Sequence, residues 1–429
     1  MDVGATQSVP DWQSPLISSS TIPKVIATGR PQENEDYPEN FFRCAKWCPD
    51  GTRALGQCED RSLQMLQPPT EVVESTMQSL PLHVNSVFRQ PSPILDFAWY
   101  PGANASNPAS YCFLASVREC PVKLLDAADG RLRASYKIID HRERQVAPHC
   151  LAFNSFATHL YCGYEDAIEV FDFQRPGEGT KIATTPSKKS RDGMKGIVSS
   201  IAFCPDYSGL YAASSLASAI SLFSETTGED PVAYLDGMTA PIMQVKFDSA
   251  RPHILYASQR RSDEILCWDV REPLEVLRRF TRASSSTNQK LLFDIDPAGH
   301  WLATGDENGD ISIFDLYSEE TEPALKFKAH DDSIGSVAFN SVDATLLSVS
   351  GSRHFNSTPI GSPSATTSSD SEDTSESEDD LGQKYYITCR RQPRRPYPMD
   401  SSVKLWKFNA GIEEAMQVGT NNQDEVMDH

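Results

Sequence analysis

A short unit of alternating apolar and turn-forming residues recurs along most of this 429-residue chain. Its clearest copy is Lys290–Phe314, in which a Pro-Ala-Gly turn and an Asn-Gly pair separate three strand-like runs: Leu291–Asp296, His300–Thr304 and Asp310–Phe314. The two turn sequences are typical of tight reversals between antiparallel strands. One such meander cannot bury its apolar face alone, so the recurrence of the unit is what limits the possible folds.

Two positions mark each copy of the unit. The first is an apolar residue just before a turn, and these residues stand about 44 to 54 positions apart: Trp47, Trp99, Phe153, Phe203, Phe247, Ile295 and Phe339. The second closes a later strand, at Gln64–Leu66, Leu124–Asp126, Val170–Asp172, Ser221–Phe223, Cys267–Asp269, Ile313–Asp315 and Leu405–Lys407. Seven such pairs without helical periodicity predict an all-β fold, a seven-bladed WD40-type β-propeller. The regular period argues against the alternative, a large β-sandwich.

The predicted propeller occupies residues 41–408. Residues 1–40 are rich in Pro, Ser and acids and are predicted to be mostly disordered. A strand near residues 21–27 is the exception, because the last repeat lacks an outer strand that would close the ring. The seventh repeat carries an insertion, residues 351–401, that is Ser/Thr-rich, then acidic, then basic, and is also predicted to be disordered. Residues 409–429 form an acidic C-terminal tail.

Several classes of protein are disfavoured by what the sequence lacks. It has no run of about 18 apolar residues and no secretory signal pattern, so we expect no membrane partner. Its ten cysteines stand singly, which predicts reduced thiols in an intracellular compartment. Its nine histidines are isolated, and no catalytic, metal-ligand or phosphate-loop motif is present. We therefore expect a protein that is not an enzyme and that holds no metal and no cofactor.

The net charge of −20 is unevenly distributed, since Ser368–Asp380 holds acids and no base. In a propeller, the connections between the second and third strands of a blade emerge at the same end as those between blades. Most basic loop residues fall in these connections and the opposite connections are acidic, so we expect one basic end that binds RNA phosphates or splayed bases. The candidate RNA-binding residues are Arg118, Arg142, Arg144, Arg260, Arg261, Arg282 and Lys290. The alternative is that these are ordinary solvated loop cations, because Glu119 and Asp306 share the same end.

Three further features have alternative interpretations. Trp268, Asp269 and Arg271 form a W-D-x-R pattern that is typical of propellers docking on cullin-ligase adaptors, although Trp268 also fits a core position. The insertion contains candidate phosphorylation sites, each with an acid three residues later, as acidophilic kinases prefer. These sites are Ser369, Ser375 and Ser377. The alternative is that the insertion is only a solvated tether. His330 matches the histidine that braces a blade tryptophan, which favours a structural role.

Five segments together resemble the telomerase Cajal body protein family of WD-repeat proteins: Asn40–Thr52, Arg118–Tyr136, Gly196–Pro205, Asp263–Glu272 and Thr287–Gly305. The resemblance runs from about Asn40 to Phe408. It implies a non-enzymatic RNA-binding propeller of small nuclear ribonucleoproteins, acting in snRNA modification, splicing and telomere maintenance. The implied RNAs are H/ACA small Cajal-body RNAs (scaRNAs), with telomerase RNA as a further candidate.

The same resemblance implies protein partners and a location. The partners are H/ACA ribonucleoprotein proteins such as dyskerin, together with a chaperonin for folding, and we expect the chain itself to be a monomer. The location is the nucleus, in the Cajal body or nucleoplasm, with the cytoplasm as a second site. Arg118, Arg260 and Lys290 lie inside the matching segments, which favours them as RNA contacts. The alternative function is a protein–protein scaffold or cullin-ligase substrate receptor that uses the W-D-x-R segment.

Overall fold

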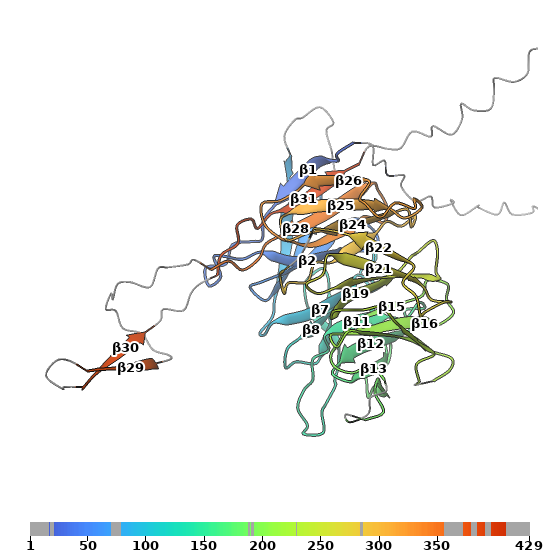
Figure 1. The fold of residues 1–429 in the computed structure, drawn as a ribbon, viewed down its shortest axis with the longest axis horizontal. Coiled ribbons are helices and arrows are strands. Elements are labelled where there is room, and N and C mark those ends of the chain that lie inside the picture. The colour runs from blue at the N-terminus through green and yellow to red at the C-terminus, as the bar shows by residue number, and fades with distance from the viewer. Residues whose placement is uncertain are drawn as a thin grey trace, which may run out of the picture.

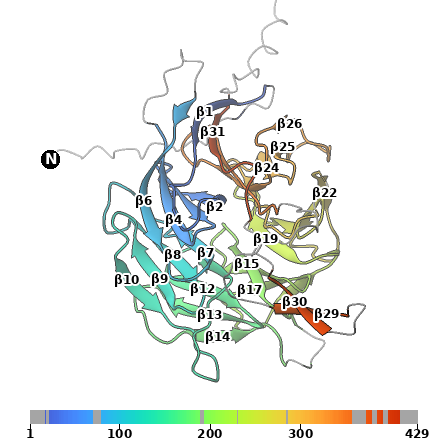
Figure 2. The same ribbon diagram turned by 90° about the vertical axis from the view of Figure 1, so that its left-hand side faces the viewer.

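The computed structural model describes residue 17, residues 21–69, 79–187, 189, 193–228, 230–283, 286–355 and 396–408, and the backbone alone of 372–378 and 384–390. These residues form strands and connections, with no helix among them, and they confirm the predicted seven-bladed propeller (Figure 1). Figure 2 shows the blades arranged around a common axis. Within the described ranges, no helix has the length and apolar character needed to span a membrane.

Each of the first six blades is a four-stranded antiparallel sheet, and its strands follow one another in sequence from the axis to the rim. Blade 1 contains β2 (Phe42–Trp47), β3 (Ala54–Cys58), β4 (Ser62–Gln67) and β6 (His83–Arg89). Blade 2 contains β7 (Ile94–Trp99), β8 (Cys112–Val117), β9 (Val122–Asp126) and β10 (Leu132–Tyr136). Blade 3 contains β11 (Cys150–Phe153), β12 (His159–Tyr164), β13 (Ala167–Asp172) and β14 (Thr180–Ala183).

The next three blades repeat this arrangement. Blade 4 contains β15 (Val198–Phe203), β16 (Leu210–Ser215), β17 (Ala219–Ser224) and β18 (Ala233–Leu235). Blade 5 contains β19 (Ile242–Phe247), β20 (Ile254–Gln259), β21 (Glu264–Asp269) and β22 (Arg278–Thr281). Blade 6 contains β23 (Phe293–Ile295), β24 (Trp301–Gly305), β25 (Asp310–Asp315) and β26 (Leu325–Lys328).

Blade 7 joins the two ends of the propeller. It contains β27 (Ile334–Phe339), β28 (Thr345–Ser350) and β31 (Val403–Lys407), and its outer strand is β1 (Lys24–Gly29). β1 runs antiparallel to β31, and the short strand β5 (Leu80–Pro81) adds to it in parallel. The outer strand therefore begins three residues later than the expected Thr21–Ala27 and ends two residues later. Because this strand comes from the opposite end of the propeller sequence, the last sheet forms only when the ring closes.

The insertion leaves blade 7 between β28 and β31, and its predicted disorder stays a prediction. β29 (Glu372–Glu378) and β30 (Lys384–Arg390) pair as an antiparallel hairpin. The register puts Glu372 opposite Arg390 and Glu378 opposite Lys384, and opposite charges at facing positions favour strand pairing. The rest of the insertion, most of residues 1–20 and residues 409–429 lie outside the described residues.

His330 braces blade 7, as its sequence context predicts. One ring nitrogen, Nδ1, lies 3.2 Å from a carboxylate oxygen of Asp400 and 3.0 Å from Oγ of Ser402. The other, Nε2, lies 2.7 Å from Oγ of Ser348, which also accepts a hydrogen bond from Nε1 of Trp406 at 2.8 Å. Burial lowers the pKa of His330, so its neutral form is favoured in the folded protein.

Candidate RNA-binding interface

All the candidate RNA-binding residues lie in connections that emerge at one end of the disc. The antiparallel order of the strands places the turn between the second and third strands of each blade at the same end as the connection to the next blade. The insertion in blade 7 leaves from this end as well. In Figure 1 its hairpin extends to the left of the ring, so Figure 2 views the ring from this side. We refer to it as the insertion end.

Arg118 and Lys290 both act electrostatically on the half-buried His149, which stands just before the inner strand of blade 3. Arg118 is in the turn between β8 and β9, whereas Lys290 is in the connection between blades 5 and 6. The pKa of His149, just before β11, is lowered first by burial and then by the positive charges of Lys290 and Arg118. Lys290 also lowers the pKa of the Cys44 and Cys150 thiols, although burial raises both overall. These thiols lie on the inner strands of blades 1 and 3.

The connection that carries Lys290 is held from three sides. Nη2 of Arg260 donates a hydrogen bond to the carbonyl oxygen of Asn288 at 3.1 Å. The carboxylate of Glu307 accepts the backbone N–H of Ser286 at 2.8 Å and that of Thr287 at 3.1 Å. On the side of blade 7, Nε2 of Gln289 donates to the carbonyl of Gly351 at 2.8 Å. Lys290 is therefore presented by a preorganised backbone rather than by an open loop.

Arg282 does not lie on the surface, and the expectation that it contacts RNA from an exposed rim is wrong. Its side chain is buried, and the residue is only 5% exposed. The guanidinium donates to the backbone carbonyls of Gln259, Ser262 and Leu291 at 3.3 to 3.4 Å. Burial lowers the pKa of Arg282 to about 10, although Asp306 opposes this shift. Arg282 joins blades 5 and 6 beneath the Lys290 connection. Its position in a loop of the sequence did not indicate this structural role.

The other candidates at this end are exposed but differ in their partners. Arg142 and Arg144 lie in the connection between blades 2 and 3. Arg144 forms an ion pair with Asp140 at 2.8 Å, and backbone N–H groups of Arg144 and Arg142 also bind that carboxylate, which lowers the pKa of Asp140 to about 2. Arg261 is exposed in the turn between β20 and β21. Within the described part of the chain, the side chains of Arg118, Arg142, Arg261 and Lys290 form no ion pair.

Non-glycine residues adopt a left-handed backbone in five of the turns between second and third strands. These residues are Arg61, Glu119, Asp166, Ser218 and Arg261, with φ between 54° and 65°. In blade 6 the corresponding turn uses Gly309 at φ 87°. A side chain in this region costs roughly 1 to 2 kcal/mol, which glycine avoids. At blades 1 and 5 the turn therefore presents an arginine in place of the conformationally easier glycine.

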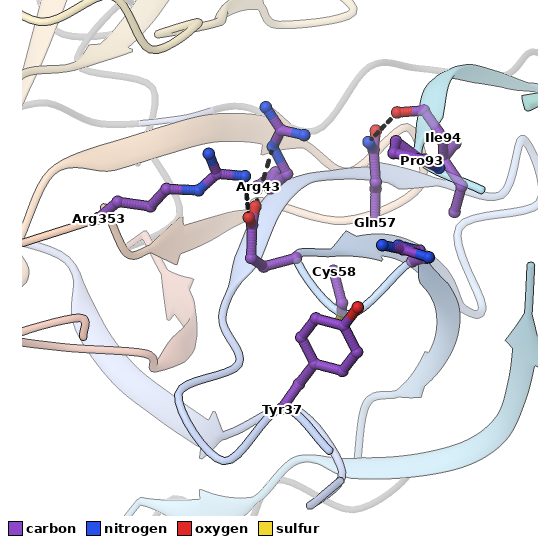
Figure 3. Close-up of a pocket in the computed structure, with 9 residues that line it drawn as sticks. Tyr37, Arg43, Gln57, Cys58, Pro93, Ile94 and Arg353 are labelled. Carbon is purple, nitrogen blue, oxygen red and sulfur yellow. Dashed lines mark hydrogen bonds and ion pairs between the residues drawn. The ribbon is translucent and has the colours of Figure 1, made fainter. Parts of the chain in front are cut away.

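A pocket of about 200 Å³ that no sequence motif predicted lies beside blade 1 (Figure 3). Its polar lining comes from four separate segments of the chain: Tyr37, Arg43, Gln57, Glu59, Arg61 and Arg353. Glu59 forms ion pairs with Arg43, at 3.7 Å, and with Arg353. Pro93 completes one wall, and its carbonyl accepts the backbone N–H of Arg118 at 3.0 Å. The pocket and Arg118 thus share a wall. The only sequence signal was that Arg43 lies inside a segment with the family resemblance.

The predicted sorting of basic and acidic loops to opposite ends of the disc stays a prediction. Acids stand among the bases at the insertion end, and several of them hold turns in place. Asp332 accepts the Ser352 hydroxyl at 2.6 Å and the backbone N–H of Met399 at 2.9 Å. Glu307 binds the Lys290 connection. Tight turns need acceptors for their free N–H groups, so these carboxylates stabilise the turns at the insertion end.

Comparison with known proteins identifies the family. No family model matches the chain. The chain is 32% identical to "Telomerase Cajal body protein 1" of Mesocricetus auratus, over 78% of this chain and 62% of that protein. It is also 32% identical to the Homo sapiens protein of the same name, over 79% of this chain and 62% of the human protein. The Mus musculus protein of the same name is 30% identical over 95% of this chain and 73% of its own length. The chain belongs to the telomerase Cajal body protein family. It spans a little under two thirds of the hamster and human members.

In this member of the telomerase Cajal body protein family, the W-D-x-R residues lie away from the insertion end. Trp268 is fully buried, and its Nε1 donates to the carbonyl of Asp236 at 2.9 Å, so it is a core residue. Asp269 follows it and forms an ion pair with the exposed Arg271 at 2.5 Å, which lowers the pKa of Asp269. Of these three residues, only Arg271 is exposed.

The phosphorylation candidates stay predictions. Ser369 lies outside the described residues, and Ser375 and Ser377 lie in β29, where the structure describes the backbone alone. The nine cysteines whose side chains are described all have free thiols. In the same part of this telomerase Cajal body protein, no cluster of His, Cys, Asp or Glu has the arrangement of a metal site.

Proposed function

We propose that this chain is a non-enzymatic RNA-binding protein of small nuclear ribonucleoproteins and that it acts in the nucleus, in the Cajal body or nucleoplasm. Its RNA would be a single-stranded loop of an H/ACA scaRNA, with telomerase RNA as a second substrate. The roles that follow are assembly and localisation of these RNAs, and hence snRNA modification, splicing and telomere maintenance. Family membership supports this proposal, because the relatives carry both "telomerase" and "Cajal body" in their names.

The observation that carries the proposal is that Arg118 and Lys290 lie in connections at the same end of the disc, where both positive charges act on His149. Two cations without an ion pair, held on preorganised turns, form a surface suited to the phosphates of a folded single strand. Sequence-specific RNA recognition mostly targets such loops, since their unstacked bases are accessible. Arg142 and Arg261, exposed at the same end, would extend the contact along the RNA backbone.

Protein partners follow from the same proposal. H/ACA ribonucleoprotein proteins such as dyskerin would bind the RNA-loaded complex, and a chaperonin would assist folding of a monomeric propeller. A chaperonin is physically reasonable here, because blade 7 needs β1 and β31 from distant parts of the sequence before its sheet is complete.

The test is to crosslink the intact protein to RNA in cells and to sequence the RNAs that copurify. We expect H/ACA scaRNAs to be enriched, and replacement of Arg118 and Lys290 by Glu to remove most of the crosslinked RNA. Arg175→Glu is the matched control, since Arg175 is exposed in the connection between β13 and β14 at the other end of the disc. In vitro, affinity should fall steeply with salt, with a log–log slope of about −0.7 per phosphate contact.

Crosslinking that survives the Arg118 and Lys290 replacements would place the RNA elsewhere. Arg271→Glu tests the alternative scaffold or ligase-receptor function. That replacement should leave RNA crosslinking unchanged, and loss of a copurifying cullin adaptor would support the alternative instead.

A further inference from the structure

We propose that the pocket in Figure 3 receives one unpaired nucleotide of the bound RNA, with its base against Tyr37 and Arg61 and its phosphate between Arg43 and Arg353. This inference rests on the proposed RNA-binding function and adds the place where a single base is held. The pocket volume of about 200 Å³ lies below the roughly 300–1,000 Å³ of pockets that enclose drug-sized ligands. A single base-sized group fits this scale better than a duplex or a peptide helix.

The base would rest on two flat groups. The residue Tyr37 is 36% exposed, and the guanidinium of Arg61 lies 5.9 Å from the centre of its ring. Aromatic rings and guanidinium planes are the surfaces on which splayed RNA bases stack. Arg61 has a left-handed backbone, with φ 65°, which is unfavourable for a residue that has a side chain. Such strained residues are concentrated at functional sites.

The phosphate would lie between two guanidinium groups that already share an anion. Arg43 and Arg353 both pair with Glu59, and their side chains are 46% and 55% exposed. Glu59 holds the two cations in position, and with Arg61 the pocket has three guanidinium groups against one carboxylate. Guanidinium groups bind phosphate through paired N–H donors, so a net positive pocket of this composition favours a phosphate.

The loop that carries Tyr37 is ordered before any ligand arrives. The backbone N–H of Tyr37 donates to the carbonyl of Asn34 at 2.9 Å, and Nδ2 of Asn34 donates to a carboxylate oxygen of Asp60 at 2.9 Å. A preordered loop loses less conformational entropy on binding. The acids of the same connection are exposed and do not line the pocket: Glu33, Glu35, Asp36 and Glu39.

The pocket also lies beside the rest of the proposed interface. Pro93 lines it and bonds to the backbone of Arg118, while the charges of Arg43 and Lys290 both lower the pKa of the Cys44 thiol, which burial raises overall. One strand of RNA could therefore contact Lys290 and Arg118 and place its next unpaired base in the pocket.

The experiment uses the intact chain and a short random-sequence single-stranded RNA that contains 4-thiouridine. We expect ultraviolet crosslinking to label the peptide that contains Tyr37. Tyr37→Ala should weaken binding roughly 5- to 150-fold, the range for loss of one base–aromatic stack, whereas Tyr37→Phe should bind as the unchanged protein does. Tyr207→Ala is the matched control, because Tyr207 is an exposed ring at the opposite end.

The outcomes separate this inference from the proposed function. If Tyr37→Ala binds normally while Lys290→Glu loses binding, the pocket assignment is wrong and the RNA function stands. If the unchanged protein shows no salt-dependent RNA binding, both are overturned. Arg353→Gln changes an exposed side chain and should also weaken binding, so the inference can be tested even if Tyr37→Ala fails to fold.

Discussion

Nη2 of Arg260 donates a hydrogen bond to the carbonyl oxygen of Asn288 at 3.1 Å, and so joins the β20–β21 turn of blade 5 to the connection that presents Lys290. Arg260 can therefore act on RNA indirectly, by holding the backbone on which Lys290 stands. This distinguishes it from its neighbour Arg261, which is exposed and contacts no part of that connection among the described residues.

The first prediction concerns this pair of arginines. Arg260→Met should raise hydrogen exchange at the backbone amides of residues 286–292 and weaken RNA binding about 3- to 10-fold, because the lost hydrogen bond is worth roughly 1 kcal/mol or slightly more. Arg261→Met should weaken RNA binding without altering that exchange. Replacing both residues by Glu should abolish RNA crosslinking while the fold is retained. Equal exchange in the two single variants would argue against a positioning role for Arg260.

The second prediction concerns the buried Arg282. Arg282→Leu removes the donors for the carbonyls of Gln259, Ser262 and Leu291, and each buried carbonyl left without a partner costs roughly 1 to 3 kcal/mol. We expect the free energy of unfolding to fall by about 2 to 4 kcal/mol, measured in urea. Arg261→Leu is the surface control and should stay within about 0.5 kcal/mol of the unchanged protein. An unchanged free energy of unfolding in Arg282→Leu would mean that the hydrogen bonds of Arg282 make no net contribution to stability.

The third prediction uses two equivalent turn positions with opposite charge. Arg61 and Glu119 have φ values of 65° and 60°, so glycine at either position relieves the left-handed strain. Part of this gain is offset by the larger entropy of the unfolded chain, and both variants should gain at most about 1 kcal/mol of stability. Only Arg61→Gly should lose RNA affinity, and Glu119→Gly should bind RNA slightly more tightly. A parallel loss of affinity in both would point to turn shape rather than charge.

The fourth prediction concerns the pH dependence of stability. Burial holds the pKa of His330 below its ordinary value of 6.5 in the folded state, whereas the imidazole of the unfolded chain takes up a proton below about that pH. The unfolded state then binds more protons, so the stability from this residue is present above pH 6.5 and is lost as the pH falls below it. We expect a lower Tm at pH 5.5 than at pH 7.5, and a smaller difference in His330→Gln.

The carboxylate partner of His330 does not obscure this measurement. The pKa of Asp400 is lowered, so its own contribution to stability is lost at pH values below the ordinary range of carboxyl groups, outside the window tested. A His330→Gln variant with the same Tm difference as the unchanged protein would assign the effect to other histidines.

The sequence by itself determined the number of blades, the place of the insertion and the core role of Trp268 and His330. Apolar alternation, turn residues and blade-closing aromatics are signals within a short stretch of sequence. Because each repeat carries its own set of them, the repeats could be counted from the sequence. The same reasoning placed Arg118 and Lys290 at one end of the disc, because loop connectivity determines which end of a propeller a loop joins. It was wrong about Arg282, since a loop position in sequence does not report how deeply a side chain packs between two blades.

Only the tertiary structure decided which of these loop residues meet. Arg353 pairs with Glu59 because blade 7 closes against blade 1. The charges of Lys290 and Arg118 both act on His149 because the ring brings connections of separate blades to one end. The pairing of β1 with β31 is likewise a consequence of closure. Such contacts join residues that are far apart in sequence. They stabilise the protein only once the ring has formed, and forming it costs conformational entropy. No local pattern of residues can encode them.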